Sequence, residues 1–337
     1  MRNETRQAFN TYLDRQAELN HVASARDKFS VEPSVQQKLE DRIREASGFL
    51  QDINIVTVPE QKGQKIGLDV GTPIASTTNT SVEGRTPKDP SALDETGYEA
   101  TQTNFDTFLT YRKLDMWAKF PDFQTRIRNL IVKQQARDRI MIGFNGTSRA
   151  ATSDLATNPK LQDVNVGWLE KIRVDAPERA VTGWKVGDQA GADYKNIDAA
   201  VMDAANELID EWFQEDTDLV CIMGRQLLSD KYLGLVDDYN APTERAALET
   251  LLSNKQVGGL RTARVPFFLP RGFLITKFSN LSIYAQEGTR RRHIKDDPEF
   301  DRIVDYQSDN EAYVIENYGA CAFVENILVP DGGGGWA

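Results

Sequence analysis

The sequence contains few residues whose chemistry could build an active site or a metal centre. Only two histidines occur, His21 and His293, and neither lies near other histidines or cysteines at the spacing of a zinc or iron site. A nucleophile paired with histidine would have to use one of these two, and neither follows a nucleophile-elbow pattern. We therefore interpret both as solvated surface residues, and predict no catalytic residue, no metal site and no cofactor.

Acidic and glycine-rich runs are present, but they lack the patterns of cation and phosphate sites. The runs 210–218 (DEWFQEDTD) and 295–300 (KDDPEF) do not show the alternating ligands and glycine of a calcium loop. We interpret them as solvated acidic surface. The glycines at 332–335 are not followed by the Lys-Ser/Thr pair of a phosphate loop, so they predict a flexible tail. No motif supports an enzymatic function.

Basic residues are concentrated in two places, although the chain is acidic. Its net charge of −11 argues against generic nucleic-acid binding. The arginines of the run 288–293 (GTRRRH) could contact phosphate or acidic side chains. An inter-subunit salt-bridge site and a simply exposed turn are the other interpretations. Residues 112–149 hold nine basic and three acidic side chains, whereas 191–250 hold four and fourteen. This uneven distribution of charge indicates either that the two regions pack against different surfaces or that each is a solvated helix face.

Length and composition predict a soluble chain with one large domain or two smaller ones. The 337 residues are 40% apolar and 27% charged. We find no apolar run of the roughly 18 residues that span a membrane, and no secretory signal. Cys221 and Cys321 each lie in an apolar, strand-like run, so we expect two buried, reduced thiols.

The first part of the chain predicts two helices joined by a polar break at 28–32. Apolar residues recur along one side of 1–28, and Pro33 suits the first turn of a second helix. We expect these helices to form an arm rather than part of a core. The apolar positions of the second helix are Val35, Leu39, Ile43, Ala46 and Leu50.

A long polar loop follows. Residues 71–90 (GTPIASTTNTSVEGRTPKDP) cannot bury enough apolar surface to offset their ordering entropy, so alone they should be flexible. Strand-like residues precede this run from Val56, and alternation returns at 104–117, which predicts a long hairpin. Loops of this length inside one chain are usually functional or disordered.

A long helix and a compact α+β unit complete the pattern. Pro121 opens a helix that ends at Gly146, and about 24 residues at 1.5 Å each give roughly 36 Å. The later apolar periods predict helices at 197–212, 225–235 and 242–252, strands at 218–223, 263–268, 273–276 and 281–284, and final alternation at 312–329.

This order of predicted elements resembles the HK97-type shell fold of tailed-phage capsid proteins. Several stretches of the sequence are similar to the major capsid proteins of P2-like phages. The similarity extends from near the first residue to about residue 329, with departures at 181–192 and in the glycine tail. The similar stretches include FSVEPSVQQ (29–37), INIVTVPEQKGQKIG (53–67), PIASTTNT (73–80), DFQTRIRNLIVKQQ (122–135), MIGFNG (141–146), LQDVNVGWLEKIR (161–173), GRQLLSDKY (224–232), ARVPFF (263–268) and LITKFSNLSIY (274–284).

The resemblance implies an α+β, HK97-like capsid fold with an N-terminal arm, an extended loop, a spine helix, a peripheral domain and an axial domain. The implied limits are 1–55 for the arm, with 1–29 removable and scaffold-facing, 56–118 for the extended-loop hairpin, 119–195 for the spine helix and first part of the peripheral domain, 196–305 for the axial domain, 306–329 for the return strand of the peripheral domain, and 330–337 for the tail.

It also implies a structural major capsid protein that self-assembles into hexamers and pentamers of an icosahedral head around double-stranded DNA. The implied partners are an internal scaffolding protein, a prohead protease, a portal protein and decoration or size-determining proteins, with packaged DNA contacted only non-specifically and no membrane. The implied location of the protein is the virion capsid, which would be assembled in the host bacterial cytoplasm. An encapsulin-like bacterial compartment shell and an acidic cytoplasmic enzyme are the alternatives.

In such shells the extended loop lies across a neighbouring subunit, and a protease trims the N-terminus. We expect cleavage close to Phe29–Ser30, because the polar break at 28–32 is a joint between two helices and exposed joints are accessible to proteases. The basic spine helix would lie opposite acidic faces or, alternatively, face the DNA. The candidate inter-subunit contacts are Thr77, Thr78, Asn79, Thr80, Arg85, Lys88, Arg290, Arg291 and Arg292.

Overall fold

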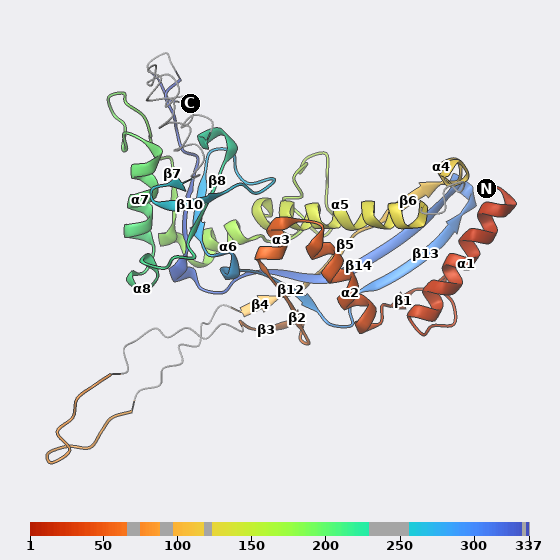
Figure 1. The fold of residues 1–337 in the computed structure, drawn as a ribbon, viewed down its shortest axis with the longest axis horizontal. Helices are drawn as coiled ribbons and strands as arrows, with labels where there is room; N and C mark the ends of the chain where they lie inside the picture. The colour runs from red at the N-terminus through yellow and green to blue at the C-terminus, as the bar shows by residue number, and fades with distance from the viewer. Residues whose placement is uncertain (66–74, 88–96, 118–122, 229–255, 332–334, 337) are drawn as a thin grey trace, which may run out of the picture.

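The computed structural model describes residues 1–65, 75–87, 97–117, 123–228, 256–331 and 335–336. Two β-sheets lie at opposite ends of an elongated body, and a long loop leaves the body near its middle (Figure 1). None of the described helices has the length and apolar character needed to cross a membrane. The α-helices are α1 (Asn3–Leu19), α2 (Pro33–Glu45), α3 (Gly48–Asp52), α4 (Tyr111–Trp117), α5 (Phe123–Asn145), α6 (Trp168–Asp175), α7 (Ile197–Leu208) and α8 (Glu211–Gln214).

A seven-stranded sheet is built around one long strand. β14 is the longest described strand, with 14 residues, and pairs with β13, β12, β5 and β6, while β1 and β2 extend the two edges. Most pairs are antiparallel, but β12 and β2 run parallel. The bounds are β1 (Phe29–Ser30), β2 (Asn54–Val58), β5 (Thr101–Asn104), β6 (Thr107–Thr110), β12 (Leu281–Gln286), β13 (Arg291–Asp297) and β14 (Arg302–Ile315).

A six-stranded sheet forms the other end of the body, in the order β7-β15-β11-β8-β10-β9. All four residues of β8 and of β11 are buried, because these strands are short apolar runs in the interior of the sheet. Helix α7 packs on it, and the Asn196 side chain caps this helix by accepting the Ala199 backbone N–H at 2.9 Å. The bounds are β7 (Ala180–Thr182), β8 (Val220–Met223), β9 (Gln256–Val257), β10 (Leu260–Ala263), β11 (Phe273–Thr276) and β15 (Ala322–Glu325).

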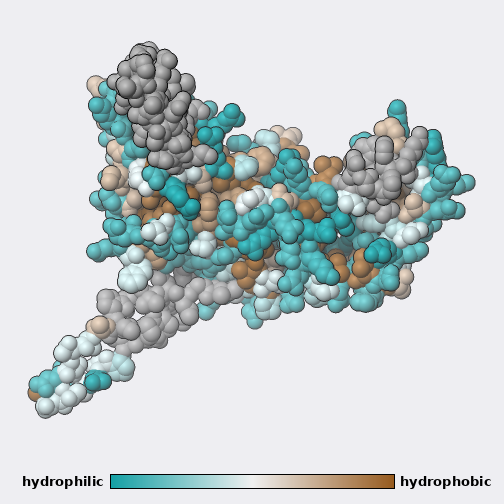
Figure 2. Space-filling model, in the orientation of Figure 1, coloured by the Kyte–Doolittle hydropathy of each residue, from teal (hydrophilic) through white to brown (hydrophobic). Residues whose placement is uncertain are grey.

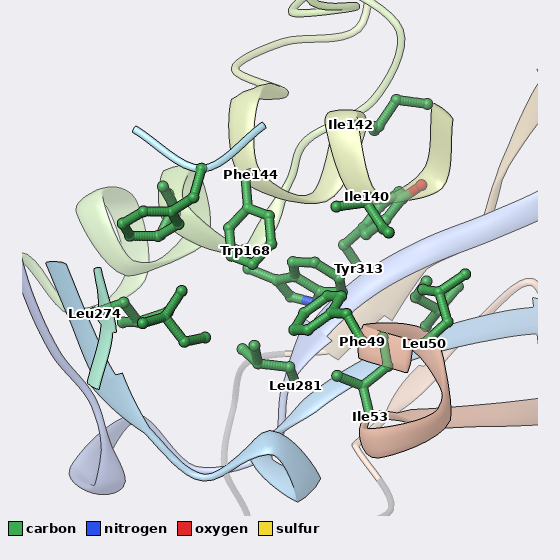
Figure 3. Close-up of a cluster of buried hydrophobic side chains, with 14 of the residues drawn as sticks. Phe49, Leu50, Ile53, Ile140, Ile142, Phe144, Trp168, Leu274, Leu281 and Tyr313 are labelled. Carbon is green, nitrogen blue, oxygen red and sulfur yellow. The ribbon is translucent and has the colours of Figure 1, made fainter. Parts of the chain in front are cut away.

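The main core lies between helix α5, helices α2, α3 and α6, and strands of both sheets (Figure 3). Trp168 is completely buried at its centre, where its indole N–H donates to the backbone oxygen of Ser282 at 3.0 Å. Its ring meets those of Phe49, Phe144 and Tyr313 edge-on at centroid distances of 5.2–6.0 Å. A Cβ atom on Gly143 would lie 2.2 Å from this ring, so helix α5 needs a glycine there.

The expectation that the first two helices form an arm outside the core is wrong for the second of them. Ile43, Leu50 and Ile53 are completely buried in the main core. The predicted second helix is also interrupted, because α2 ends at Glu45 and α3 begins at Gly48. The apolar spacing predicted the buried stripe correctly, but spacing alone cannot say whether a stripe is covered by its own subunit or by another one.

The strand pairing differs from the expected domain limits. Strands β12 and β13, expected in the axial domain 196–305, pair with β14 in the seven-stranded sheet. Within 306–329, β14 belongs to that sheet, whereas β15 pairs with β11 and β7 in the other. The chain crosses between the sheets through the 3-10 turn Tyr318–Ala320. Alternation predicts a strand but not its partner, which explains the difference.

Several predicted elements are confirmed, with shifted bounds. The long helix is α5, with 23 residues, and the strands at 273–276 and 281–284 match β11 and β12. The strand predicted at 263–268 lies earlier, at Leu260–Ala263. Cys221 and Cys321 are buried, and neither is part of a disulfide, as expected. Most of the two helices predicted at 225–235 and 242–252 lies outside the described residues.

Candidate assembly surfaces

The extended loop is anchored to the body at its base. Strands β3 (Lys62–Gln64) and β4 (Gly97–Glu99) form a two-stranded hairpin there. The buried Tyr98 ring packs edge-on against Tyr284 of the seven-stranded sheet, with 4.9 Å between ring centroids. Its hydroxyl donates to the Glu60 backbone oxygen at 3.3 Å. The base of the loop is therefore fixed by the subunit's own core.

The described tip of the loop, residues 75–87, has no comparable support. All of it is exposed except Thr78, which is half-buried, and Val82 is 81% exposed. Asn79 organises a local turn: its side-chain oxygen accepts the Ser81 N–H at 3.1 Å, and its backbone oxygen accepts the Val82 N–H at 3.0 Å. Figure 2 shows the tip standing clear of the body. Of the remaining candidate contacts, Arg85 lies on this tip and Lys88 lies outside the described residues.

The three consecutive arginines do not form one surface. Arg290 is buried and donates to Glu40 at 2.6 Å and to Asp309 at 3.2 Å. Arg292 donates to Asp305 at 2.7 Å and to Tyr12 at 2.8 Å, beneath α1. Arg291 alone is exposed. Successive side chains of a strand point to opposite faces, so the prediction of one inter-subunit site is corrected: Arg290 and Arg292 are engaged within their own subunit.

The joint at Phe29–Ser30 is not exposed in the way that the sequence suggested. These residues form β1, which pairs with β13, and the Phe29 side chain is only 7% exposed. Phe29 and Val31 alternate with polar residues, which gives the pattern of a half-buried strand. The exposed parts of the joint are the preceding turn, residues 26–28, and Ser30 within β1.

Helix α1 covers the far end of the seven-stranded sheet. Its Leu13 and Ala17 pack in a small apolar cluster with Tyr111, Ile294 and Ile303, among others. Polar contacts surround this cluster: Arg6 Nη1 lies 3.1 Å from Asp296, and the Arg2 backbone N–H donates to Asp115 at 2.9 Å. Burial and a hydrogen bond to Asp296 raise the pKa of Tyr111 to about 12. The helix is thus held by its own cluster, separate from the main core.

The spine helix α5 carries both exposed and buried basic side chains. Arg128, Lys133 and Arg137 are exposed. Arg139 is fully buried and donates to Glu311 at 2.9 Å and to Glu40 at 3.0 Å. At this position the basic helix lies opposite acidic side chains of its own chain.

Sequence reasoning missed the buried ionic cluster around Arg139. A signal was available, because Val132, Ala136 and Ile140 mark the buried side of α5, and Arg139 falls beside them at helical spacing. A charged residue on an apolar helix face must be paired when it is buried. Its partners come from α2 and β14, and their placement could not be derived from the sequence.

Comparison with known sequences places these surfaces in context. The profile described as "Phage major capsid protein, P2 family" matches residues 8–327. The chain is 49% identical over 346 residues to "Capsid proteins" of Escherichia phage P2, covering 98% of this chain and 96% of that protein. It is 41% identical to the "Major capsid protein" of Serratia phage KSP20, covering 99% of this chain and 100% of that protein.

Solved capsid structures have the same fold. A chain of the structure "Satellite phage P4 procapsid including size determination (Sid) protein" superposes with a TM-score of 0.82 at 47% identity, covering 98% of this chain and 99% of that chain. A chain of the capsid of an empty GTA particle superposes with a TM-score of 0.51 at 16% identity, covering 84% of this chain and 90% of that chain. The second similarity concerns the fold alone.

Proposed function

The chain belongs to the P2 family of phage major capsid proteins, and from this premise we propose that it self-assembles into the hexamers and pentamers of an icosahedral head that encloses double-stranded DNA. The fold is the α+β capsid fold of HK97 type. The proposal rests on the exposure of the loop tip, residues 75–87. The base of the loop packs against the seven-stranded sheet through Tyr98, whereas the tip has almost no burial of its own.

The proposed role of the loop is to lie across a neighbouring copy. A polar loop loses conformational entropy when it is ordered, and burial against another chain would offset that loss. Threonine-rich segments favour extended pairing. Thr77, Thr78, Asn79, Thr80 and Arg85 remain our candidate contacts on the loop.

One face of the seven-stranded sheet is a suitable landing surface for a neighbour's loop. Phe108 and Tyr306 are 57% and 43% exposed there, and Arg291 and Lys295 are exposed beside them. The register places all four on one face, because Phe108 pairs with Val304, Lys295 also pairs with Val304, and Arg291 pairs with Ser308. The combination of aromatic rings and cations suits an extended polar chain with carboxylates, and residues 66–96 contain five acidic and two basic side chains.

We propose that residues 1–29 are removed by a prohead protease, with cleavage near Phe29–Ser30. The separate apolar cluster under α1 supports this, because α1 can leave without dismantling the main core. The exposed turn at 26–28 gives a protease its first access. Since Phe29 is buried in β1, cleavage at that bond requires local opening of β1 from β13.

The remaining proposed partners are an internal scaffolding protein, a portal protein, and decoration or size-determining proteins, with packaged DNA bound only non-specifically. The P4 procapsid whose chain superposes on this one includes a size determination protein, which supports a partner of that kind here. Assembly would take place in the host bacterial cytoplasm. We propose a structural role, with no catalytic residue and no cofactor. An encapsulin-like compartment shell is not favoured, given the family match over residues 8–327.

The decisive experiment removes the loop tip and leaves its base. Residues 76–87 are replaced by a short Gly-Ser linker, with Tyr98 and the β3–β4 hairpin unchanged. The variant is co-expressed with the scaffold partner, and closed particles are counted by electron microscopy. We expect at least a tenfold loss of particles (about 1.4 kcal/mol per tenfold change), with an unchanged circular-dichroism spectrum and thermal midpoint. Closed shells at the normal yield would refute the proposed role of the loop.

A control variant separates loss of contact from loss of loop shape. Asn79→Gly keeps a turn-forming residue but removes the side-chain acceptor of the Ser81 N–H. We expect it to assemble better than the linker variant and less well than the unchanged chain.

A further inference from the structure

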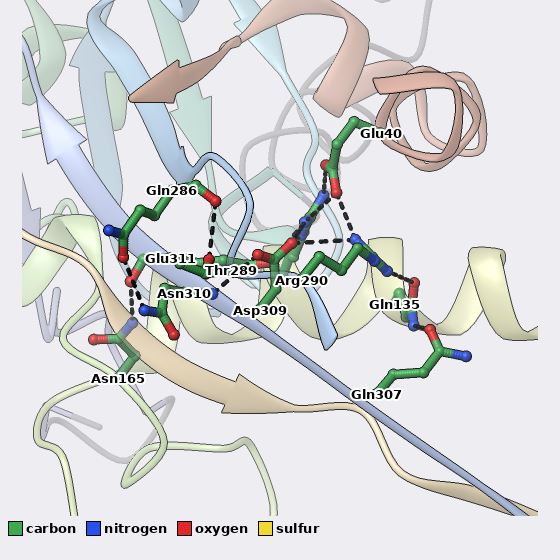
Figure 4. Close-up of polar contacts among 11 residues, drawn as sticks. Glu40, Gln135, Asn165, Gln286, Thr289, Arg290, Gln307, Asp309, Asn310 and Glu311 are labelled. Carbon is green, nitrogen blue, oxygen red and sulfur yellow. Dashed lines mark hydrogen bonds and ion pairs between the residues drawn. The ribbon is translucent and has the colours of Figure 1, made fainter. Parts of the chain in front are cut away.

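Two arginines and three carboxylates meet inside the subunit, where four elements come together (Figure 4). Arg139 of α5 donates to Glu311 of β14 at 2.9 Å and to Glu40 of α2 at 3.0 Å. Arg290, just before β13, donates to Glu40 at 2.6 Å and to Asp309 of β14 at 3.2 Å. The cluster therefore ties helix α2 and the spine helix to the central strand of the sheet.

All five side chains are buried. The exposed fractions of the residues are 0% for Arg139, Asp309 and Glu311, 2% for Arg290 and 9% for Glu40. Their charges do not balance when every group is ionised, because three carboxylates face two guanidinium groups. An unpaired charge in the interior is costly, and a buried group normally avoids that cost by taking up or losing a proton. Guanidinium groups stay protonated, so a proton taken up by this cluster would sit on a carboxylate.

The contacts distinguish Asp309 from the other two carboxylates. Glu40 binds both arginines, and Glu311 accepts two N–H groups of Arg139. Asp309 has one guanidinium nitrogen within hydrogen-bond distance, that of Arg290, while Arg139 lies 3.9 Å away. Burial raises the pKa of Asp309 to about 7, an effect that the nearby arginines only partly oppose. Burial would also raise the pKa of Glu40, but Arg139 and Arg290 hold it below its usual value.

An unused hydrogen-bond acceptor lies next to Asp309. Thr103 of β5 is its directly opposed residue in the antiparallel pair. Opposed side chains lie on the same face with Cβ atoms about 4.5–5.5 Å apart. The Thr103 hydroxyl oxygen is buried and has no hydrogen-bond partner among the described residues. After a small side-chain rotation a protonated Asp309 can donate to this oxygen, and an ionised Asp309 can accept from the hydroxyl, so Thr103 offers Asp309 a partner in either state.

We propose that this cluster is a proton-binding site in which Asp309 carries the shared proton, and that the protonated cluster fastens α2 and the spine helix to the sheet. The charged groups that face Asp309 are Arg290, Arg139 and Glu40 from the neighbouring elements and Glu311 from its own strand. Gln135, which accepts from Arg290, and Gln307, which accepts from Gln135, do not titrate.

The expected pH dependence follows from the direction of the Asp309 shift. Its pKa in the folded chain, about 7, lies above that of an unfolded aspartate, about 3.9. Between these values the folded chain binds more protons than the unfolded chain, so raising the pH destabilises it. The contribution of this proton is complete below about pH 4 and is lost as the pH rises through about 7. Above that pH the joint between α2, α5 and β14 should loosen.

Infrared spectroscopy of the full-length, unassembled chain tests the site directly. A protonated buried acid has a carbonyl stretch that a carboxylate lacks. We expect this band at about pH 5 and its loss by about pH 8, with a parallel fall of the thermal midpoint. Asp309→Asn, which mimics the protonated acid, should lack the band and show a flatter midpoint profile. Glu311→Gln balances the charges at two against two, so Asp309 should ionise and the band should again be absent.

A matched control uses a buried carboxylate that already has one arginine to itself. Asp297 is 8% exposed and accepts from Arg302 at 2.8 Å, so Asp297→Asn should keep both the band and the steep midpoint profile. The proposal is overturned if the unchanged chain shows no acid band in this pH range, or if the band survives in Asp309→Asn, which would place the proton on another residue. Failure of Asp309→Asn to fold also counts against it, since the amide replaces a neutral acid.

Discussion

Two apolar clusters hold different parts of this subunit, and they differ in how they could be opened. The main core gathers residues from helices and both sheets around Trp168, and many of its members are completely buried. The cluster beneath α1 is smaller, its members keep 1–9% of their surface exposed, and one helix covers much of it. The first cluster therefore determines whether the subunit folds, whereas the second determines whether its N-terminal segment stays attached.

The difference shows how one chain can have a stable core and an N-terminal helix that detaches more easily. Local opening of a protein costs less free energy where few apolar contacts are broken. Release of α1 breaks the contacts of Leu13 and Ala17 and a few polar pairs, but leaves Trp168 and its aromatic neighbours in place. This separation would allow the removal of residues 1–29 that we propose without loss of the main core.

The largest expected effect is in the main core. Trp168→Ala removes the central ring and leaves the Ser282 backbone oxygen without its indole donor. We expect a loss of about 3–5 kcal/mol in the free energy of unfolding, a large share of the stability of an ordinary domain. Urea unfolding followed by circular dichroism measures it. Trp168→Phe keeps an aromatic ring and should lose clearly less; equal losses in the two variants would contradict the packing account.

A smaller and local effect is expected beneath α1. Leu13→Ala should weaken the attachment of the helix by about 2 kcal/mol, at the low end for a buried leucine because this cluster lies at the rim of the fold. Hydrogen exchange should speed up in residues 3–19 and leave α5 protected. Equal acceleration in both helices would mean that the two clusters open together rather than separately.

The smallest effect is expected for the polar contacts at the edge of α1. Arg6 Nη1 lies 3.1 Å from Asp296, but its side chain is half exposed, so solvent and salt screen the pair. Arg6→Ala should change the attachment of α1 by about 0.2–1 kcal/mol. The same hydrogen-exchange measurement, repeated at low and high salt, checks this. An effect as large as that of Leu13→Ala would show that polar contacts, not apolar packing, hold the helix.

Particular residues show how far sequence reasoning could reach. The apolar spacing of α5 and α7 and the short apolar runs of β8 and β11 predicted elements that the structure contains. The polar composition of 71–90 predicted a loop without support of its own, and the described tip is exposed. The arginines at 290–292 were misassigned, because two of the groups that bury and bind them, Glu40 and Tyr12, lie more than 200 positions away in the chain.

The family, the α+β character and the position of the polar loop could be predicted from the sequence, because they depend on local composition, periodicity and similarity along the whole chain. The folded chain was needed to show that α2 belongs to the core, that residues 306–329 divide between two sheets, and that three carboxylates share two buried arginines. Those features depend on contacts between segments that are far apart in the chain. Whether a residue is buried depends on which segments pack against it, not on its residue type alone.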